Sequence, residues 1–141
     1  MAPVRVHVVE DDERLRGSLT RLLGAAGYLV MAWPDADAAV AAMTGGSLVE
    51  VVLADGLRTR DGDDLLDALL AAGTVAVAVR FGLGAEGPPH ALEVIRLRMV
   101  GDSAAVLSAV ARATSAAHMV NAGLAAAGLL PGDVDHVTGA A

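Results

Sequence analysis

Acidic residues follow two stretches of this sequence that are predicted to be buried strands. Three consecutive acids, residues 10–12, come directly after the valine-rich residues 4–9, and Asp55 comes directly after residues 49–54. Carboxylates brought together repel one another, which raises their pKa values unless a cation neutralises them. Mg²⁺ suits such a site because it binds a few carboxylate oxygens and keeps waters that a phosphoryl ligand can replace. In a simpler interpretation, Asp12 only caps a helix and the other acids are solvated.

The elements that must position these acids alternate along the chain. Hydrophobic patterning predicts strands at 4–9, 28–33, 49–54, 74–79 and 94–100, the last of them an edge strand. Helices are predicted between them, with Asp12 as the N-cap of the first and Asp63 as the N-cap of the third. This order requires a mostly parallel sheet with helices on both faces, a doubly wound α/β domain. If the first and third strands are neighbours, their acids converge at the carboxyl edge of the sheet.

Composition excludes several classes of protein. The 141 residues suffice for one ordinary domain, and the absence of cysteine excludes disulfide frameworks and thiolate metal sites. A net charge of −7 and an aromatic content of 2% argue against nucleic acid as a partner. No signal segment or apolar run long enough to cross a membrane is evident, so we expect a soluble, cytoplasmic protein. All ten basic residues are arginines, which we interpret as a GC-rich coding bias.

The acids and their spacing resemble those of the receiver domain of two-component response regulators. The matching residues are Val-Val-Glu10-Asp11-Asp12 followed by Leu15-Arg16, and then Leu53-Ala54-Asp55, whose aspartate lies forty-four positions after Asp11. The resemblance covers about residues 4–114 and is more specific before Asp55 than after it. It implies a flavodoxin-like, five-stranded parallel sheet in the order 2-1-3-4-5.

The resemblance also implies a function for these residues. Glu10, Asp11 and Asp55 would hold Mg²⁺, together with the backbone carbonyl of Leu57. Asp55 would accept a phosphoryl group from a histidine kinase or a phosphotransfer protein. The protein would then signal through contacts with other proteins and would not be an enzyme.

Several positions after Asp55 depart from the family pattern. Val79 stands where receivers place a threonine or serine that binds the phosphoryl group, so this hydroxyl donor is lost. Arg98 stands at the lysine position and keeps a positive charge with a different geometry. Arg96 replaces the aromatic switch residue, and Phe81 is an aromatic residue beside the predicted end of the fourth strand. We expect Phe81 and Arg96 to belong to the switch or partner surface.

The glycine- and proline-rich residues 82–89 stand where receivers have a fourth helix. This shortening resembles an alphaproteobacterial subgroup of stand-alone receivers with a Phe-Ala-Thr-Gly-bulky-Tyr motif, in which a loop replaces that helix. Gly82, Gly84 and Gly87 also form a G-x-G-x-x-G pattern, but Pro88-Pro89 argues against the helix that a dinucleotide site needs. The isolated His7 is expected to pack beside the sheet without binding a metal.

Three functions remain open at this stage. The first is a stand-alone response regulator, and the second is a pseudo-receiver that binds a protein partner without phosphorylation. A weaker third is a small phosphohydrolase with Asp55 as its nucleophile. Such enzymes place a general acid two residues after the nucleophile, and this chain has Leu57 at that position. Residues 115–141, here called the extension, follow the receiver-like residues 1–114. The extension either lengthens the last helix or provides a surface for a homodimer or a partner.

Overall fold

A five-stranded parallel sheet forms the centre of the protein in a computed structural model that describes residues 4–44, 48–54, 58–81, 94–97 and 103–128. The sheet has the order β2-β1-β3-β4-β5, as expected. Its strands are β1 (Arg5–Val9), β2 (Leu29–Trp33), β3 (Glu50–Ala54), β4 (Ala76–Phe81) and β5 (Val94–Leu97). The predicted edge strand, β5, lies at the edge beside β4, and β1 and β3 are neighbours.

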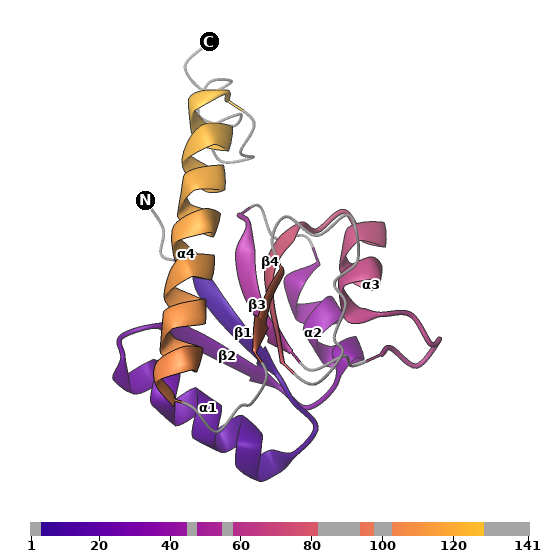
Figure 1. Cartoon of the computed structure of the whole chain (residues 1–141). Coiled ribbons are helices and arrows are strands. Elements are labelled where there is room, and N and C mark those ends of the chain that lie inside the picture. The colour runs from indigo at the N-terminus through magenta and orange to yellow at the C-terminus, as the bar shows by residue number, and fades with distance from the viewer. Residues whose placement is uncertain (1–3, 45–47, 55–57, 82–93, 98–102, 129–141) are drawn as a thin grey trace.

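Helices cover both faces of the sheet, as the alternation of elements predicted. Within the described residues these are α1 (Glu13–Ala25), α2 (Ala36–Met43), α3 (Leu65–Ala71) and α4 (Ser103–Ala126). Figure 1 shows α1 and α4 on one side of the sheet and α2 and α3 on the other. Residues 82–93 lie outside the described part of the chain, and with them the expected replacement of a fourth helix by a loop.

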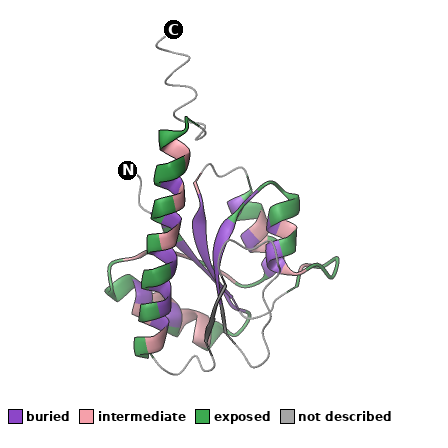
Figure 2. Ribbon diagram, turned by 45° about the horizontal axis from the view of Figure 1, so that its top comes forward, coloured by how far each residue is buried: buried purple, intermediate pink, exposed green. Residues whose placement is uncertain are grey.

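Alternate residues of the central strands fill two separate cores. On the side of α1 and α4, Val8, Leu53 and Val79 pack with the helices, and on the other side Val9 and Val52 pack with α2 and α3. Both faces of β3 are therefore buried, as Figure 2 shows for the centre of the sheet. Each fully buried valine or leucine contributes about 1.5–3 kcal/mol relative to an exposed side chain.

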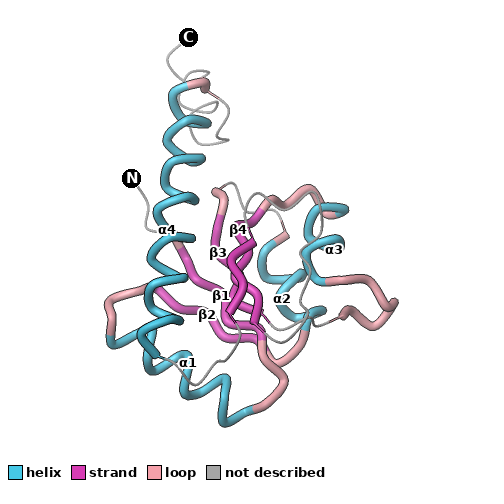
Figure 3. The backbone as a smooth tube through the Cα atoms, viewed as in Figure 1, coloured by secondary structure: helices cyan, strands magenta, loops and turns pink. Residues whose placement is uncertain are grey.

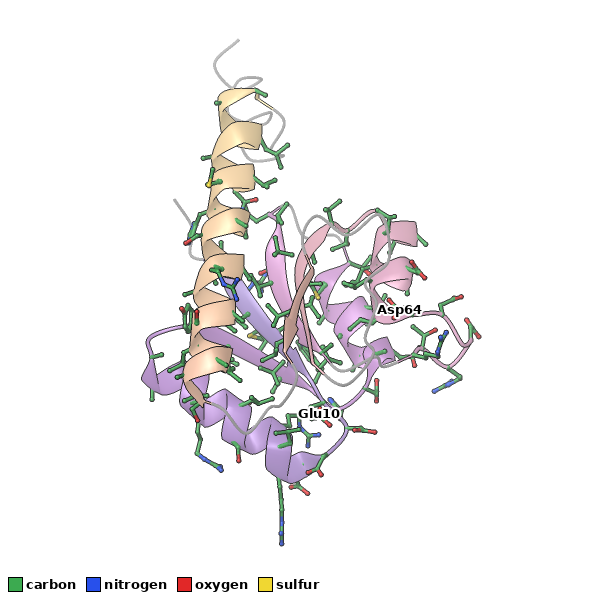
Figure 4. The ribbon with its side chains drawn as sticks, viewed as in Figure 1. Glu10 and Asp64 are labelled. Carbon is green, nitrogen blue, oxygen red and sulfur yellow. The ribbon has the colours of Figure 1, made fainter. Side chains whose placement is uncertain are left out.

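The helix boundaries agree with the sequence at α1 and differ by one residue at α3. Asp12 caps α1, because its carboxylate accepts hydrogen bonds from the N–H groups of Arg14 and Leu15 at 2.9 and 3.1 Å. The prediction that Asp63 caps the third helix is wrong. Asp64, labelled in Figure 4, accepts the N–H of Leu66 at 3.0 Å. Thr59 contacts both the N–H and the carbonyl of Asp63, which keeps that residue in the preceding loop.

The fourth strand also begins later than predicted. Thr74, expected to start it, donates its N–H to the carbonyl of Leu69 at 2.8 Å and so completes the end of α3. The strand runs from Ala76 to Phe81, two residues further along than the predicted 74–79. Val79 is consequently inside β4 and is followed by two more strand residues.

The last helix, α4, continues without a break from residue 103 into the extension and ends at Ala126, as Figure 3 shows. Ala113, Ala117 and Asn121 are buried against the rest of the protein. The longer last helix that the sequence suggested is therefore present up to this point. Residues 129–141 lie outside the described part.

Candidate functional site

Glu10 is a buried carboxylate at the carboxyl end of β1. Its side chain is only 5% exposed, and Figure 4 shows it in the loop that joins β1 to α1. The N–H of Glu10 donates to the carbonyl of Trp33 at 3.1 Å, and Oε1 of Glu10 accepts the N–H of Asp12 at 3.1 Å. Arg16 from α1 donates to the carbonyl of Glu10 at 2.9 Å. The position of this loop is thus determined by both β2 and α1.

The two aspartates that follow Glu10 differ in their surroundings. Asp11 is exposed to solvent, so it can contribute a carboxylate to a bound cation. Asp12 is also exposed, but one of its oxygens accepts two backbone N–H groups of α1. The structure therefore confirms the helix cap for Asp12.

The register of the sheet brings the two acidic strand ends together. Val9 of β1 is the register partner of Ala54, the last residue of β3. In the sequence Glu10 follows Val9 and Asp55 follows Ala54, so the predicted metal ligands come from neighbouring strand ends. Asp55 itself lies outside the described residues, as does Leu57.

The remaining predicted site residues come from β4 and β5. Val79 is fully buried in the core beside α1 and α4, where it pairs in register with Leu53 of β3. Arg98 lies outside the described residues. Phe81 and Arg96 are described as strand backbone only, and they lie in β4 and β5.

Because β4 ends later than predicted, it includes a residue that sequence reasoning missed. Arg80 is the register partner of Ala54 on one side and of Arg96 on the other. Two arginine backbones therefore lie level with the residue that precedes Asp55. The sequence signal was present, since Arg80 directly follows Val79, but the strand was expected to end at that valine.

A buried polar network lies on the opposite side of β1 from Val8. His7 is 1% exposed and Glu50 is 5% exposed, and their side chains meet at 3.2 Å between Nε2 and Oε1. Arg5 donates from Nε to Oε2 of Glu50 at 2.6 Å. Trp33 donates from its indole Nε1 to Nδ1 of His7 at 2.9 Å. The sequence predicted that His7 packs beside the sheet, but not that it joins three strands by hydrogen bonds.

This network determines the charge state of Glu50. Burial raises the pKa of the Glu50 carboxyl, but the hydrogen bonds from His7 and Arg5 lower it by more, so the pKa lies below the ordinary value of 4.5. Both carboxylate oxygens have a donor. Glu50 is therefore a paired, charged group inside the sheet. It lies about one strand length away from the acidic loop, residues 10–12.

The chemistry of the acidic edge fits a hard cation. Glu10 and Asp11 supply carboxylate oxygens, and Mg²⁺ prefers oxygen ligands of this kind. Among the described residues no group of three histidine, cysteine, aspartate or glutamate side chains is close enough to bind a metal ion. Glu10 and Asp11 are thus the described part of the ligand set that the sequence predicts.

A cleft of about 430 Å³ opens at the other end of the sheet. It lies between the starts of β1 and β2 and the middle of α4, and is lined by Val4, Gly27, Tyr28, Leu29, Thr114 and His118. Because the acids stand at the carboxyl ends of the strands, this cleft is separate from them. None of the described helices is both long enough and apolar enough to span a membrane.

Comparisons with known proteins identify the fold. No family model and no curated protein matches the sequence. A response regulator receiver domain protein (CheY-like) from Methanospirillum hungatei has a similar structure, with a TM-score of 0.61 and 17% identity over 82% of this chain and 95% of that chain. A response regulator receiver protein from Sinorhizobium medicae has a TM-score of 0.61 and 20% identity, and the match covers 80% of this chain and 95% of that chain.

A third similar structure is the receiver domain of the hybrid histidine kinase CckA. Its TM-score is 0.58 at 20% identity, and the match covers 78% of this chain and 98% of that domain. These structures share the parallel α/β architecture at low sequence identity, so the likeness concerns the fold. The chain has the fold of the receiver domains of response regulators.

Proposed function

We propose that this protein is a stand-alone response regulator that accepts a phosphoryl group on Asp55. The donor would be a phosphohistidine of a histidine kinase or of a phosphotransfer protein. The observation that supports this most strongly is the register of β1 with β3, because it pairs the strand ends that precede Glu10 and Asp55. We propose residues 1–114 as the receiver-like domain and the extension as a continuation of its last helix.

In the proposed reaction the carboxylate of Asp55 attacks the phosphorus atom of phosphohistidine. The new P–O bond forms as the P–N bond breaks, and the imidazole nitrogen of the donor takes up the electron pair. Glu10, Asp11, Asp55 and the carbonyl of Leu57 would hold Mg²⁺, which would neutralise charge on the phosphoryl oxygens. Arg98 would pair with one of those oxygens as a cationic donor.

Position 79 supports a second candidate, a pseudo-receiver that binds its partner without phosphorylation. Val79, which the resemblance places at the hydroxyl position of receivers, is fully buried among apolar side chains, so this position offers no hydrogen bond to a phosphoryl oxygen. A hydrogen bond to a charged group is worth about 1.5–3 kcal/mol. Without it, phosphorylation of Asp55 would be coupled more weakly to the conformation of the partner surface at β4 and β5. In this case the surface near Phe81 and Arg96 would bind the partner constitutively.

An NMR titration of the ¹⁵N-labelled chain with Mg²⁺ and then beryllofluoride tests the proposed phosphorylation site. We expect shifts at the amides of Glu10 and Asp11 with Mg²⁺, and further shifts around Asp55 with beryllofluoride. Asp55→Asn should abolish the second set, whereas Asp61→Asn, which alters an exposed loop acid, should preserve both. If beryllofluoride with Mg²⁺ shifts nothing near Asp55, the phosphoacceptor role is wrong and the pseudo-receiver is favoured.

A further inference from the structure

The buried histidine of β1 is linked to the acidic loop through one tryptophan. Trp33 is the last residue of β2, and its indole N–H donates to Nδ1 of His7 at 2.9 Å. Its backbone carbonyl accepts the N–H of Glu10 at 3.1 Å. The residue that contacts His7 by its side chain therefore contacts Glu10 by its main chain.

The direction of these hydrogen bonds is set by the chemistry of the indole. An indole nitrogen only donates, so Nδ1 of His7 accepts and carries no proton in this arrangement. The proton of the neutral ring then lies on Nε2, which donates to Oε1 of Glu50 at 3.2 Å. The two rings are also nearly parallel, with an interplanar angle of 17° and centroids 6.3 Å apart. His7 is thus held in one orientation at both nitrogens.

The far end of this chain of hydrogen bonds is itself restrained. Glu50 begins β3 and is nearly fully buried, and its second oxygen is occupied by Arg5 at 2.6 Å. A buried carboxylate is stable only when its oxygens are paired, so the side chain of Glu50 has little freedom to rotate. The network therefore provides a rigid support on which the indole of Trp33 is fixed.

We propose that His7 is a positioning residue for the acidic loop that begins at Glu10, and that it acts through Trp33. By holding the indole, His7 holds the end of β2, and the carbonyl at that end holds the first residue of the cation-binding loop. The inference rests on the proposed function for its consequence, because the loop it positions is the proposed Mg²⁺ site. The positioning itself is independent of any metal.

Amide hydrogen exchange in metal-free protein tests the positioning directly. In His7→Leu we expect the Glu10 amide to exchange at least about tenfold faster, relative to the amide of Leu53 in β3. A purely structural role would accelerate both amides together through global unfolding. In His7→Asn the Glu10 amide should exchange, relative to the Leu53 amide, within about threefold of the wild type, because the side-chain oxygen of asparagine can replace Nδ1 as the acceptor for the indole.

Two further variants keep the test decisive if His7→Leu does not fold. Trp33→Phe removes only the N–H and part of the ring, and we expect the same selective loss of protection at Glu10. Met31→Leu changes the register partner of His7 on β2 without altering any of these hydrogen bonds, and should leave the Glu10 amide as in the wild type. Unchanged relative protection of Glu10 in both His7→Leu and Trp33→Phe would overturn the inference.

The Mg²⁺ affinity of the same variants provides a second readout, measured by isothermal calorimetry. We expect the Kd of His7→Leu to rise about three- to tenfold and that of His7→Asn and Met31→Leu to change less than about twofold. A folded His7→Leu protein with the wild-type Kd would contradict a role in the metal site. Wild-type protein that binds no Mg²⁺ would refute the proposed function, and the exchange rates would still decide the role of His7.

Discussion

Asn121 binds both backbone polar groups of Val49, seventy-two residues earlier in the chain. Its Oδ1 accepts the N–H of Val49 at 2.8 Å and its Nδ2 donates to the carbonyl at 3.0 Å. Both residues are buried, and Asn121 is the only asparagine in the sequence. This pair ties the extension, through α4, to the residue that precedes β3.

We expect Asn121→Ala to lower the free energy of unfolding by about 2–4 kcal/mol. The substitution leaves a buried N–H and a buried carbonyl without partners, and each such group costs about 1–3 kcal/mol. Urea denaturation followed by circular dichroism would measure the change. Met119→Ala removes an exposed side chain from the same helix and should change stability by less than about 0.5 kcal/mol. Equal stabilities of the two variants would show that the hydrogen bonds between Asn121 and Val49 contribute little.

The pairing of Glu50 with His7 and Arg5 predicts a pH dependence of stability. The folded-state pKa of Glu50 lies below 4.5, so its charged form stabilises the fold above that pH. The contribution is lost as the pH falls through the folded-state pKa. We therefore expect the stability difference between wild type and Glu50→Gln to be largest near neutral pH and to shrink below about pH 4. Thermal unfolding across this range measures it, with Asp61→Asn as an exposed control whose effect should stay small at every pH.

The different surroundings of Glu10 and Asp12 predict different effects on Mg²⁺ binding. Glu10→Gln and Asp11→Asn should each raise the Kd about tenfold or more, because each removes a charged oxygen ligand. Asp12→Asn should change the Kd by less than about twofold, since asparagine caps a helix as well as aspartate does. Asp12→Ala should instead lower stability by about 1 kcal/mol. If Asp12→Asn weakened binding as much as Glu10→Gln, the assignment of Asp12 as a cap alone would be wrong.

The burial of Val79 predicts that restoring a hydroxyl there does not restore phosphoryl binding. Val79→Thr places a polar group among apolar side chains, and we expect a loss of about 1–3 kcal/mol in stability. The affinity for beryllofluoride with Mg²⁺ should stay within about twofold of the wild type. Val77→Thr, on the same face of β4, is the matched control. It should lose a similar amount of stability and keep the wild-type affinity for beryllofluoride. Tighter beryllofluoride binding in Val79→Thr alone would place position 79 in the phosphoryl site.

Local signals account for what sequence reasoning could predict correctly. The cap at Asp12 depends on N–H groups two and three residues away, and the buried strands on a run of neighbouring apolar residues. The same reasoning missed the start of β4, because Thr74 is drawn into the end of α3 by a hydrogen bond that hydrophobicity does not reveal. It also placed the cap of α3 at Asp63, although Thr59 holds that residue in the loop.

The sequence by itself determined the alternating α/β order, the parallel sheet and the acids at two strand ends, because patterning and capping are properties of adjacent residues. Only the tertiary structure decided which distant groups meet. The pairing of His7 with Glu50 depends on β1 lying beside β3. The hydrogen bonds between Asn121 and Val49 depend on how α4 packs on the sheet. Hydrogen bonds are directional and short, so a contact across forty or seventy residues is set by register and packing, which no local pattern encodes.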